Sequence, residues 1–390
     1  MMANRFIYLD NHATTPMDPR VLKSMLPWMG SSFGNAHSRD HALGDQSARA
    51  VEAARAEVAA LVGAAPDNII FTSGATESAN IAIEGFCLKM KQMGRKVRMA
   101  LPPTEHLAAL ETCHEMARRN LAEINWIAVD SLGRVDVAQI ETLCRDGINF
   151  ICIMGANNEI GNIYPVDVIG KISAEYGAAV FCDGSQAIGK IPFDFDKSHV
   201  DYLAVSGHKI YGPKGIGSLV IRHTNSVCPT RFGGGHEQNV RPGTLNVPGI
   251  VGLGVACRLR QEEMGKDEAR IQTMRNRMQM LLSERVSSLK VNGDSISRLA
   301  GNLHVAVGGV PNDAVIAQVR DRLAISTGSA CSSGSDAPSH VLRGIGLADE
   351  WIHGALRIGI GKFNDEQDIE ESADALCKAI ERVRKMCVTA

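Results

Sequence analysis

Two residues in this sequence have the type and setting of a nucleophile. Lys209 follows the apolar run 202–205 and lies in a glycine-rich turn, where partial burial would favour the neutral amine that attacks carbonyl groups. Cys331 lies among small polar residues in 326–335, where a thiol would be accessible to a reactant. Taken alone, each could equally be an ordinary loop residue, so other parts of the sequence must decide.

Other residues are suited to binding an anion and a cationic ring. In 72–78 we expect a strand to end, Ser73 and Gly74 to turn the chain, and a helix to begin whose free N–H groups and dipole favour a phosphate. Asp183 directly follows an apolar run, so its carboxylate could face a protonated ring nitrogen, and Gln186 could reach the same ligand. The alternatives are a plain helix cap at 72–78 and a turn cap at Asp183.

The stretch 184–190 also fits the first seven positions of a nucleotide-binding P-loop. That motif ends in Ser or Thr, which binds magnesium, and continues into a helix. Here the next residues are Ile191 and Pro192, so neither the ligand nor a long helix is expected. The sequence therefore argues against nucleotide hydrolysis.

Together these parts match the needs of a pyridoxal-phosphate (PLP) site. Such a site requires a phosphate-binding helix start, a carboxylate for the ring nitrogen and a lysine for the aldehyde. The segment 72–78, Asp183 and Lys209 supply the three parts, and Cys331 adds a second nucleophile.

The elements that must position these residues alternate between short β-branched runs and longer amphipathic stretches. Because a helical pattern at 166–176 joins two apolar strands, we expect βαβ units and a mainly parallel sheet with helices on both faces. A long charged helix is expected at 255–289 and a last one at 365–387. The other expected elements are a helix at 76–90 and strands at 68–72, 150–154, 178–182, 202–205 and 217–221.

The composition narrows the class of protein. The 390 residues are 45% hydrophobic and 22% charged, with a formal net charge of -2, which argues against direct binding of nucleic acid or an anionic membrane surface. No run approaches the ~18 apolar residues of a membrane span. The ten cysteines include no Cys-x-x-Cys pair, so no metal site is expected. Without an export signal, scattered cysteines predict a reduced, cytoplasmic protein.

A family resemblance rests on motifs that run nearly from end to end of the chain. They are 8–16, 33–35, 71–80, 104–106, 157–161, 206–217, 233–237, 241–244 and 328–331. In this order they resemble the group I cysteine desulfurases of the NifS/IscS type, which are fold-type I PLP enzymes of the class-V aminotransferase family. The resemblance implies an α/β fold: a large PLP domain (15–255) with a mainly parallel seven-stranded sheet between helices, and a smaller α+β domain (1–14 and 256–390) that carries Cys331.

The resemblance also implies a role for each matched residue. Lys209 would hold PLP as a Schiff base, Asp183 would pair with the pyridinium nitrogen, and Gln186 would bond the phenolic oxygen. His106 would stack on the ring and move protons. The phosphate would be bound by Ala75, Thr76, Ser206 and His208, and Thr244 would contact the neighbouring subunit's phosphate. Asn158 and Arg357 would bind the substrate carboxylate, and Asn158 would also touch the cofactor.

The implied reaction converts L-cysteine to L-alanine and leaves the sulfur on Cys331 as a persulfide. A homodimer would then pass the sulfur to an acceptor protein for iron–sulfur cluster assembly, thio-cofactor synthesis or nucleic-acid thiolation. The alternatives are another PLP aminotransferase or lyase with Cys331 a bystander, a selenocysteine lyase, and a sulfur carrier or scaffold. His12 departs from the family, where Ala, Asn or Ser is common, and Lys362 replaces a common arginine.

Overall fold

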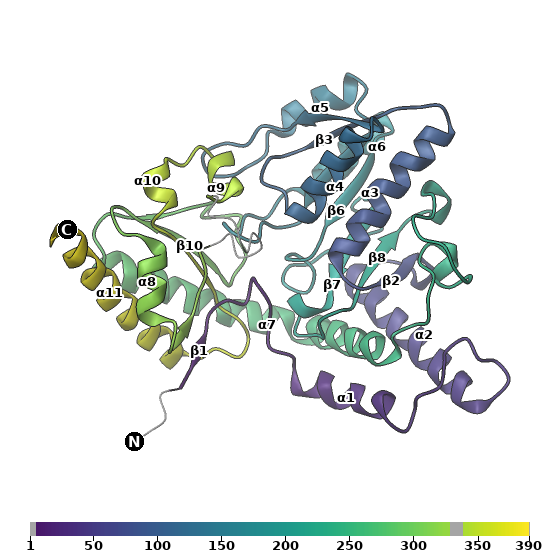
Figure 1. The fold of residues 1–390 in the computed structure, drawn as a ribbon, viewed down its shortest axis with the longest axis horizontal. Helices are drawn as coiled ribbons and strands as arrows, with labels where there is room; N and C mark the ends of the chain where they lie inside the picture. The colour runs from purple at the N-terminus through teal and green to yellow at the C-terminus, as the bar shows by residue number, and fades with distance from the viewer. Residues whose placement is uncertain (1–4, 328–337, 390) are drawn as a thin grey trace.

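The computed structural model describes residues 5–327 and 338–389 and shows two packed parts joined by one long helix (Figure 1). The larger part is built on a sheet whose strands lie in the order β2-β8-β7-β6-β5-β3-β4. Its strands are β2 (Ile69–Thr72), β3 (Val97–Leu101), β4 (Ala122–Trp126), β5 (Phe150–Met154), β6 (Ala179–Asp183), β7 (Tyr202–Ser206) and β8 (Gly217–Ile221).

The sheet is mainly parallel, as the sequence predicts. The pairs β3–β4, β3–β5, β5–β6 and β6–β7 are parallel. Strand β8 is antiparallel to both of its neighbours, β7 and β2. The strand predicted at 217–221 therefore exists but runs against the others, because the loop 207–216 after β7 returns the chain beside that strand without a crossover helix.

Helices cover both faces of this sheet, because its central strands are apolar on both sides. In β5, Ile151 and Ile153 join one hydrophobic core, and Phe150 and Cys152 join another. The first core packs under α2, α5, α6 and α7, and the second under α3 and α4. The helices are α1 (Pro19–Met29), α2 (Ala42–Val62), α3 (Ala75–Gln92), α4 (Leu107–Arg118), α5 (Val137–Arg145), α6 (Val166–Tyr176) and α7 (Val247–Arg285).

The smaller part has its own core and its own sheet. Strands β9 (Leu289–Val291), β10 (Asn302–Val307) and β12 (Ala355–Gly359) pair antiparallel in the order β12-β10-β9. The N-terminal β1 (Ile7–Tyr8) pairs with β11 (Leu323–Ala324). The helices here are α8 (Asn312–Val319), α9 (His340–Gly344), α10 (Asp349–Ile352) and α11 (Glu366–Thr389).

Helix α7 connects the two parts and begins earlier than the sequence predicts. Its first turns pack against α1 and α2, and its later turns contribute Met278 to the core of the smaller part. The predicted start near 255 is wrong. The side chain of Asn246 caps the helix by accepting a hydrogen bond from the N–H of Gly249, and the glycine-rich residues that follow are helical. These glycines serve packing: a Cβ on Gly254 would lie 2.7 Å from the Cα of Ala54 in α2.

Candidate active site

Strands β2, β3, β5, β6 and β7 all end at one edge of the large sheet, and a cavity of about 490 Å³ opens there. Ligands bind at this edge in open α/β sheets because several loops and helix N-termini converge on it. The predicted site residues that line the cavity are Ala75, Thr76, His106, Asn158, Asp183, Gln186, Ser206, His208, Lys209 and Arg357.

Two predicted site residues are not in this wall. Thr244 lies in the described chain but does not line the cavity. Cys331 lies outside the described residues. The cavity therefore brings together the predicted cofactor-binding and substrate-binding residues. The role of Cys331 as sulfur acceptor stays a prediction from the sequence.

Lys209 is held in a short turn directly after β7. Its Nζ donates to the backbone carbonyls of His12 at 2.5 Å and Ala13 at 2.8 Å. Thr15 fixes the turn from the same N-terminal segment, because its hydroxyl donates to the carbonyl of His208 and accepts from the N–H of Tyr211, both at 2.9 Å. The N-terminal segment thus aims the amine into the cavity.

Helix α3 begins at the cavity wall with no side chain capping its first turn. Its N-cap is Gly74, which has no side-chain cap bond, and the helix continues for 18 residues. Gly217 packs against one side of this turn, where an added Cβ would lie 2.8 Å from the Cα of Gly74, whereas a Cβ on Gly74 itself would meet no atom within 4 Å. The free N–H groups and the helix dipole favour an anion at this position.

The acidic side of the cavity contains Asp183 and a second carboxyl group. Asp183 ends β6, is 7% exposed, and accepts a hydrogen bond from the N–H of Ser185 at 2.9 Å. Behind it lies Glu105, which is fully buried and accepts from the N–H of Met154 at 2.7 Å. Burial and the nearby Asp183 charge raise the pKa of Glu105 to about 8. Glu105 is therefore mostly protonated at neutral pH.

Basic side chains lie in and beside the cavity wall. Arg357 on β12 is 2% exposed, bonds Asp10 at 3.0 Å, and donates to the carbonyl of Asn158 at 3.2 Å. Burial and the neighbouring Lys209 lower the pKa of Lys190 to about 7. The same two causes lower the pKa of His208 to about 4. The Arg357 guanidinium and the other N–H donors of these side chains suit a ligand with a phosphate and a carboxylate.

Comparison with known proteins identifies the family. Residues 7–371 match the aminotransferase class-V family. The chain belongs to this family. Cysteine desulfurase IscS of Anaeromyxobacter dehalogenans is 41% identical over 382 residues, covering 97% of this chain and 94% of that protein. Cysteine desulfurase IscS of Rickettsia massiliae is 40% identical, covering 97% of this chain and 92% of that protein.

Solved structures agree with this assignment. A NifS-like protein superimposes with a TM-score of 0.89 at 31% identity, covering 96% of this chain and 99% of that one. SspA in complex with cysteine gives 0.80 at 32% identity, covering 92% and 100%. DndA from Streptomyces lividans gives 0.76 at 34% identity, covering 89% and 97%. The predicted family, its α/β fold and PLP as cofactor are confirmed.

The cavity of this member of the aminotransferase class-V family fits PLP. The uncapped start of α3 suits the phosphate, the buried carboxylate of Asp183 suits a protonated ring nitrogen, and Lys209 suits the aldehyde. In the described ranges, no three His, Cys, Asp or Glu side chains gather as a metal site would need. Nor does any helix among those residues have the length and apolar character to cross a membrane.

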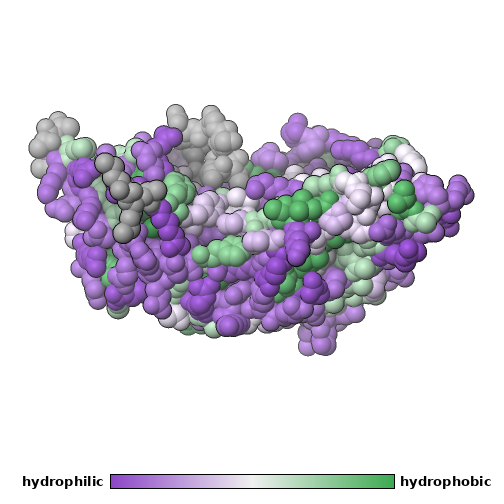
Figure 2. Space-filling model, turned by 90° about the horizontal axis from the view of Figure 1, so that it is seen from below, coloured by the Kyte–Doolittle hydropathy of each residue, from purple (hydrophilic) through white to green (hydrophobic). Residues whose placement is uncertain are grey.

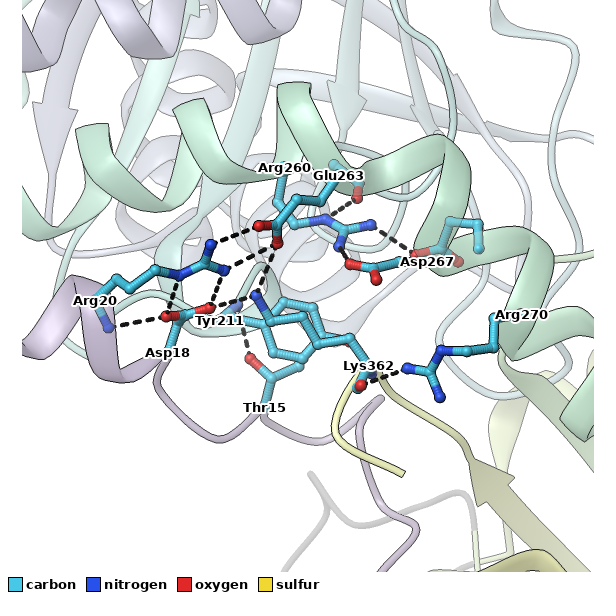
Figure 3. Close-up of polar contacts among 11 residues, drawn as sticks. Thr15, Asp18, Arg20, Tyr211, Arg260, Glu263, Asp267, Arg270 and Lys362 are labelled. Carbon is cyan, nitrogen blue, oxygen red and sulfur yellow. Dashed lines mark hydrogen bonds and ion pairs between the residues drawn. The ribbon is translucent and has the colours of Figure 1, made fainter. Parts of the chain in front are cut away.

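A polar cluster supports the Lys209 turn from the side of α1 and α7 (Figure 3). Lys362 donates from its N–H to the Tyr211 hydroxyl at 2.8 Å and from its ammonium to Asp18 at 2.5 Å. Asp18 also accepts from Arg20 at 2.8 Å. Hydrogen bonds from Arg20 and Lys362 hold the pKa of Asp18 far below its usual range. Asp18 therefore stays ionised at neutral pH and keeps its ion pairs with Arg20 and Lys362.

Three residues near the cavity were not predicted as part of the site. Lys190 donates to Gln186 at 2.6 Å, Glu105 lies behind Asp183, and His12 bonds Gln186 at 3.1 Å. The sequence pattern marks Lys190 only as the end of the false P-loop and His12 only as a departure from the family. No local signal identifies them, because each depends on a partner from another element.

Proposed function

We propose that this protein desulfurates L-cysteine with PLP bound at Lys209 and that Cys331 receives the sulfur. The observation that carries the proposal is the meeting of Lys209, Asp183 and Arg357 in one cavity with the uncapped start of α3. The IscS relatives, whose names state cysteine desulfurase activity, support the same reaction.

PLP, when bound, supplies an electron sink for negative charge that develops at the substrate Cα. The chain's own residues do the rest. Arg357 binds the substrate carboxylate with its planar guanidinium, assisted by Asn158. Lys209 Nζ removes the Cα proton. His106, which lines the cavity, would hold the cofactor ring and carry protons.

The sulfur step needs a thiolate from Cys331. A new S–S bond forms between Cys331 and the substrate sulfur, and the substrate C–S bond breaks with its electron pair left on carbon. Protonation of that carbon, together with return of a proton from Lys209 to Cα, completes L-alanine, and Cys331 retains the sulfur as a persulfide. The step needs no outside oxidant, because the substrate carbon is reduced as the two sulfurs are oxidised.

Replacing Cys331 tests this proposal. Cys331→Ser should bind PLP and L-cysteine, which changes the cofactor absorbance, but should release no sulfide above background. Cys387→Ser, which removes an exposed thiol near the end of α11, is the matched control and should keep full activity. Normal turnover by Cys331→Ser would overturn the persulfide step, and would favour another PLP lyase that acts without a protein thiol.

We further propose a homodimer in which Thr244 reaches the cofactor phosphate of the neighbouring subunit. Its absence from this chain's own cavity supports that role. A hydrophobic surface on α1 and nearby loops supports a partner there, and the face seen in Figure 2 includes α1. Its exposed side chains are Leu22, Leu26 and Met29 on α1 and Phe33 in the loop that follows. Sedimentation should give the mass of a dimer, and Phe33→Glu should shift it toward the monomer.

The remaining proposals concern the domain boundaries, the cellular location and the sulfur-acceptor protein. Two separate hydrophobic cores, one at each end of α7, support domains at 15–255 and at 1–14 with 256–390. The described cysteines are all free, which supports a reduced, cytoplasmic setting. The sulfur then passes to an acceptor protein in iron–sulfur assembly or a thiolation pathway. Mass spectrometry of mixtures with labelled Cys331 persulfide would identify the acceptor.

A further inference from the structure

His12 lies in the cavity wall, and the reaction proposed above gives it no role. Its side chain is on the segment between β1 and α1 and is 3% exposed. The ring edge packs on Gly359, where an added Cβ would lie 2.9 Å from His12 Cδ2. Gly359 follows Arg357 by two residues on β12 and therefore shares its face of the strand. The ring is held beside the arginine that we assign to the substrate carboxylate.

The hydrogen bonds around Gln186 determine which His12 nitrogen carries the proton. Lys190 Nζ donates to Gln186 Oε1 at 2.6 Å, and Gln186 Nε2 donates to the His12 carbonyl at 2.9 Å. The amide orientation is therefore fixed, with Oε1 as the acceptor. His12 Nδ1 lies 3.1 Å from that same oxygen, so Nδ1 must carry the hydrogen.

The ring is neutral, and its second nitrogen is an acceptor. Burial, together with the charges of Lys190 and Arg357, holds the pKa of His12 well below its usual value. With Nδ1 protonated, Nε2 presents a lone pair. Nε2 is buried and has no hydrogen-bond partner among the described residues. Buried acceptors almost always have a donor, so this one points to a group that arrives with a ligand.

The proposed substrate has one hydrogen-bond donor without an assigned partner. L-cysteine offers an amine, a carboxylate and a thiol. The amine would take the place of Lys209 at the cofactor aldehyde, and the Lys209 amine keeps the carbonyls of His12 and Ala13 as acceptors. The carboxylate is an acceptor itself and binds Arg357. The thiol is left, and neutral imidazole nitrogen accepts from a thiol.

We propose that His12 Nε2 accepts a hydrogen bond from the thiol of bound L-cysteine and so selects amino acids that carry this donor. The inference rests on the proposed function and names the group that recognises the side chain. His12 is a substrate-binding residue here, and Gln186 and Lys190 are positioning residues that fix its tautomer.

The test compares two ligands that differ only in the thiol. In the PLP-loaded Cys331→Ser protein, L-cysteine and L-alanine are titrated by the change in cofactor absorbance. Adding His12→Ala should weaken L-cysteine binding about three- to fivefold, as expected for one net hydrogen bond, and change L-alanine binding less than about twofold. An equal loss for both ligands, or no loss for L-cysteine, would overturn the inference.

Two further variants separate recognition from folding. Asn11→Ala is the matched control, because Asn11 bonds the Gly359 carbonyl at 2.8 Å but does not line the cavity. It should leave the preference for L-cysteine over L-alanine unchanged. If His12→Ala does not retain PLP, His12→Asn replaces it, since its shorter side chain keeps the polarity but cannot reach the thiol.

A spectroscopic readout is independent of these affinities. In nitrogen-15 spectra of the Cys331→Ser protein, His12 should show a neutral ring protonated at Nδ1, assigned by its loss in His12→Asn. L-cysteine should shift the Nε2 signal, and L-alanine should leave it nearly in place. Failure of the Cys331→Ser protein with intact His12 to bind L-cysteine would instead count against the proposed function.

Discussion

The buried ion pair between Lys362 and Asp18 permits a quantitative prediction. Their side chains are 5% and 3% exposed, and the charged atoms are 2.5 Å apart. Removing one member of a buried pair costs about 3–5 kcal/mol, because the other charge is left in a poor solvent. Asp18 here keeps Arg20 at 2.8 Å. We therefore expect Lys362→Met, which preserves most of the side-chain volume, to lower the free energy of unfolding by about 2–3 kcal/mol.

The dependence on pH follows from the lowered pKa of Asp18. A carboxyl group whose folded-state pKa is depressed stabilises the fold above its unfolded value of about 4, and this contribution is lost as the pH falls through the folded-state pKa. Losing Lys362 leaves the folded-state pKa of Asp18 less depressed. The difference between the two proteins should therefore stay constant from neutral pH to about pH 4 and narrow below it.

Urea unfolding of the PLP-loaded enzyme, followed by circular dichroism over this pH range, measures both quantities. Lys378→Met is the matched control, because its pair with Asp374 is an exposed contact one helical turn away. It should change the free energy of unfolding by less than about 0.5 kcal/mol. A similarly small effect of Lys362→Met at neutral pH, or a difference that widens as the pH falls, would refute the reasoning.

Two further changes probe the cavity itself. Burial and Asp183 raise the pKa of Glu105 to about 8, so its contribution to stability declines as the pH rises from about 4 to about 8. Glu105→Gln should therefore gain stability relative to the wild type across that window in urea unfolding, and equal stability at both ends would contradict the assignment. Arg357→Lys keeps the charge but loses the guanidinium fork, so KM for L-cysteine should rise about tenfold or more in a sulfide-release assay, and an unchanged KM would place the carboxylate elsewhere.

The elements of the fold that were predictable are those whose pattern is local. The helix 166–176 matches α6, because its apolar residues recur at helical spacing and Gly177 ends it in the left-handed region. Strands β3 and β4 were not predicted. Arg98 lies inside β3, and β4 at the sheet edge is only partly buried, so neither has a continuous apolar run. Their place in the sheet depends on neighbours far along the chain.

The same distinction applies to the site. Lys209 and Asp183 were predictable, because Asp183 stands at the end of one apolar strand and Lys209 three residues after another, and parallel strands end at one edge. His12 was not, since its partner Gln186 lies 174 residues away and comes from another element. A residue whose role is fixed by such a distant partner leaves no spacing signal in a single sequence.

The charges in the cavity link ligand binding to the state of Lys190. Lys190, Lys209 and Arg357 act on one another, and their mutual repulsion contributes to the lowered pKa of Lys190. An anionic ligand near this group would relieve that repulsion. PLP brings a phosphate and L-cysteine a carboxylate, so each should raise the pKa of Lys190 and favour its charged form. The charged ammonium donates more strongly to Gln186, which in turn holds the His12 ring in one tautomer. Binding of the phosphate and the carboxylate thus strengthens the hydrogen bonds from Lys190 through Gln186 to His12, which hold His12 Nε2 ready to accept from the substrate thiol.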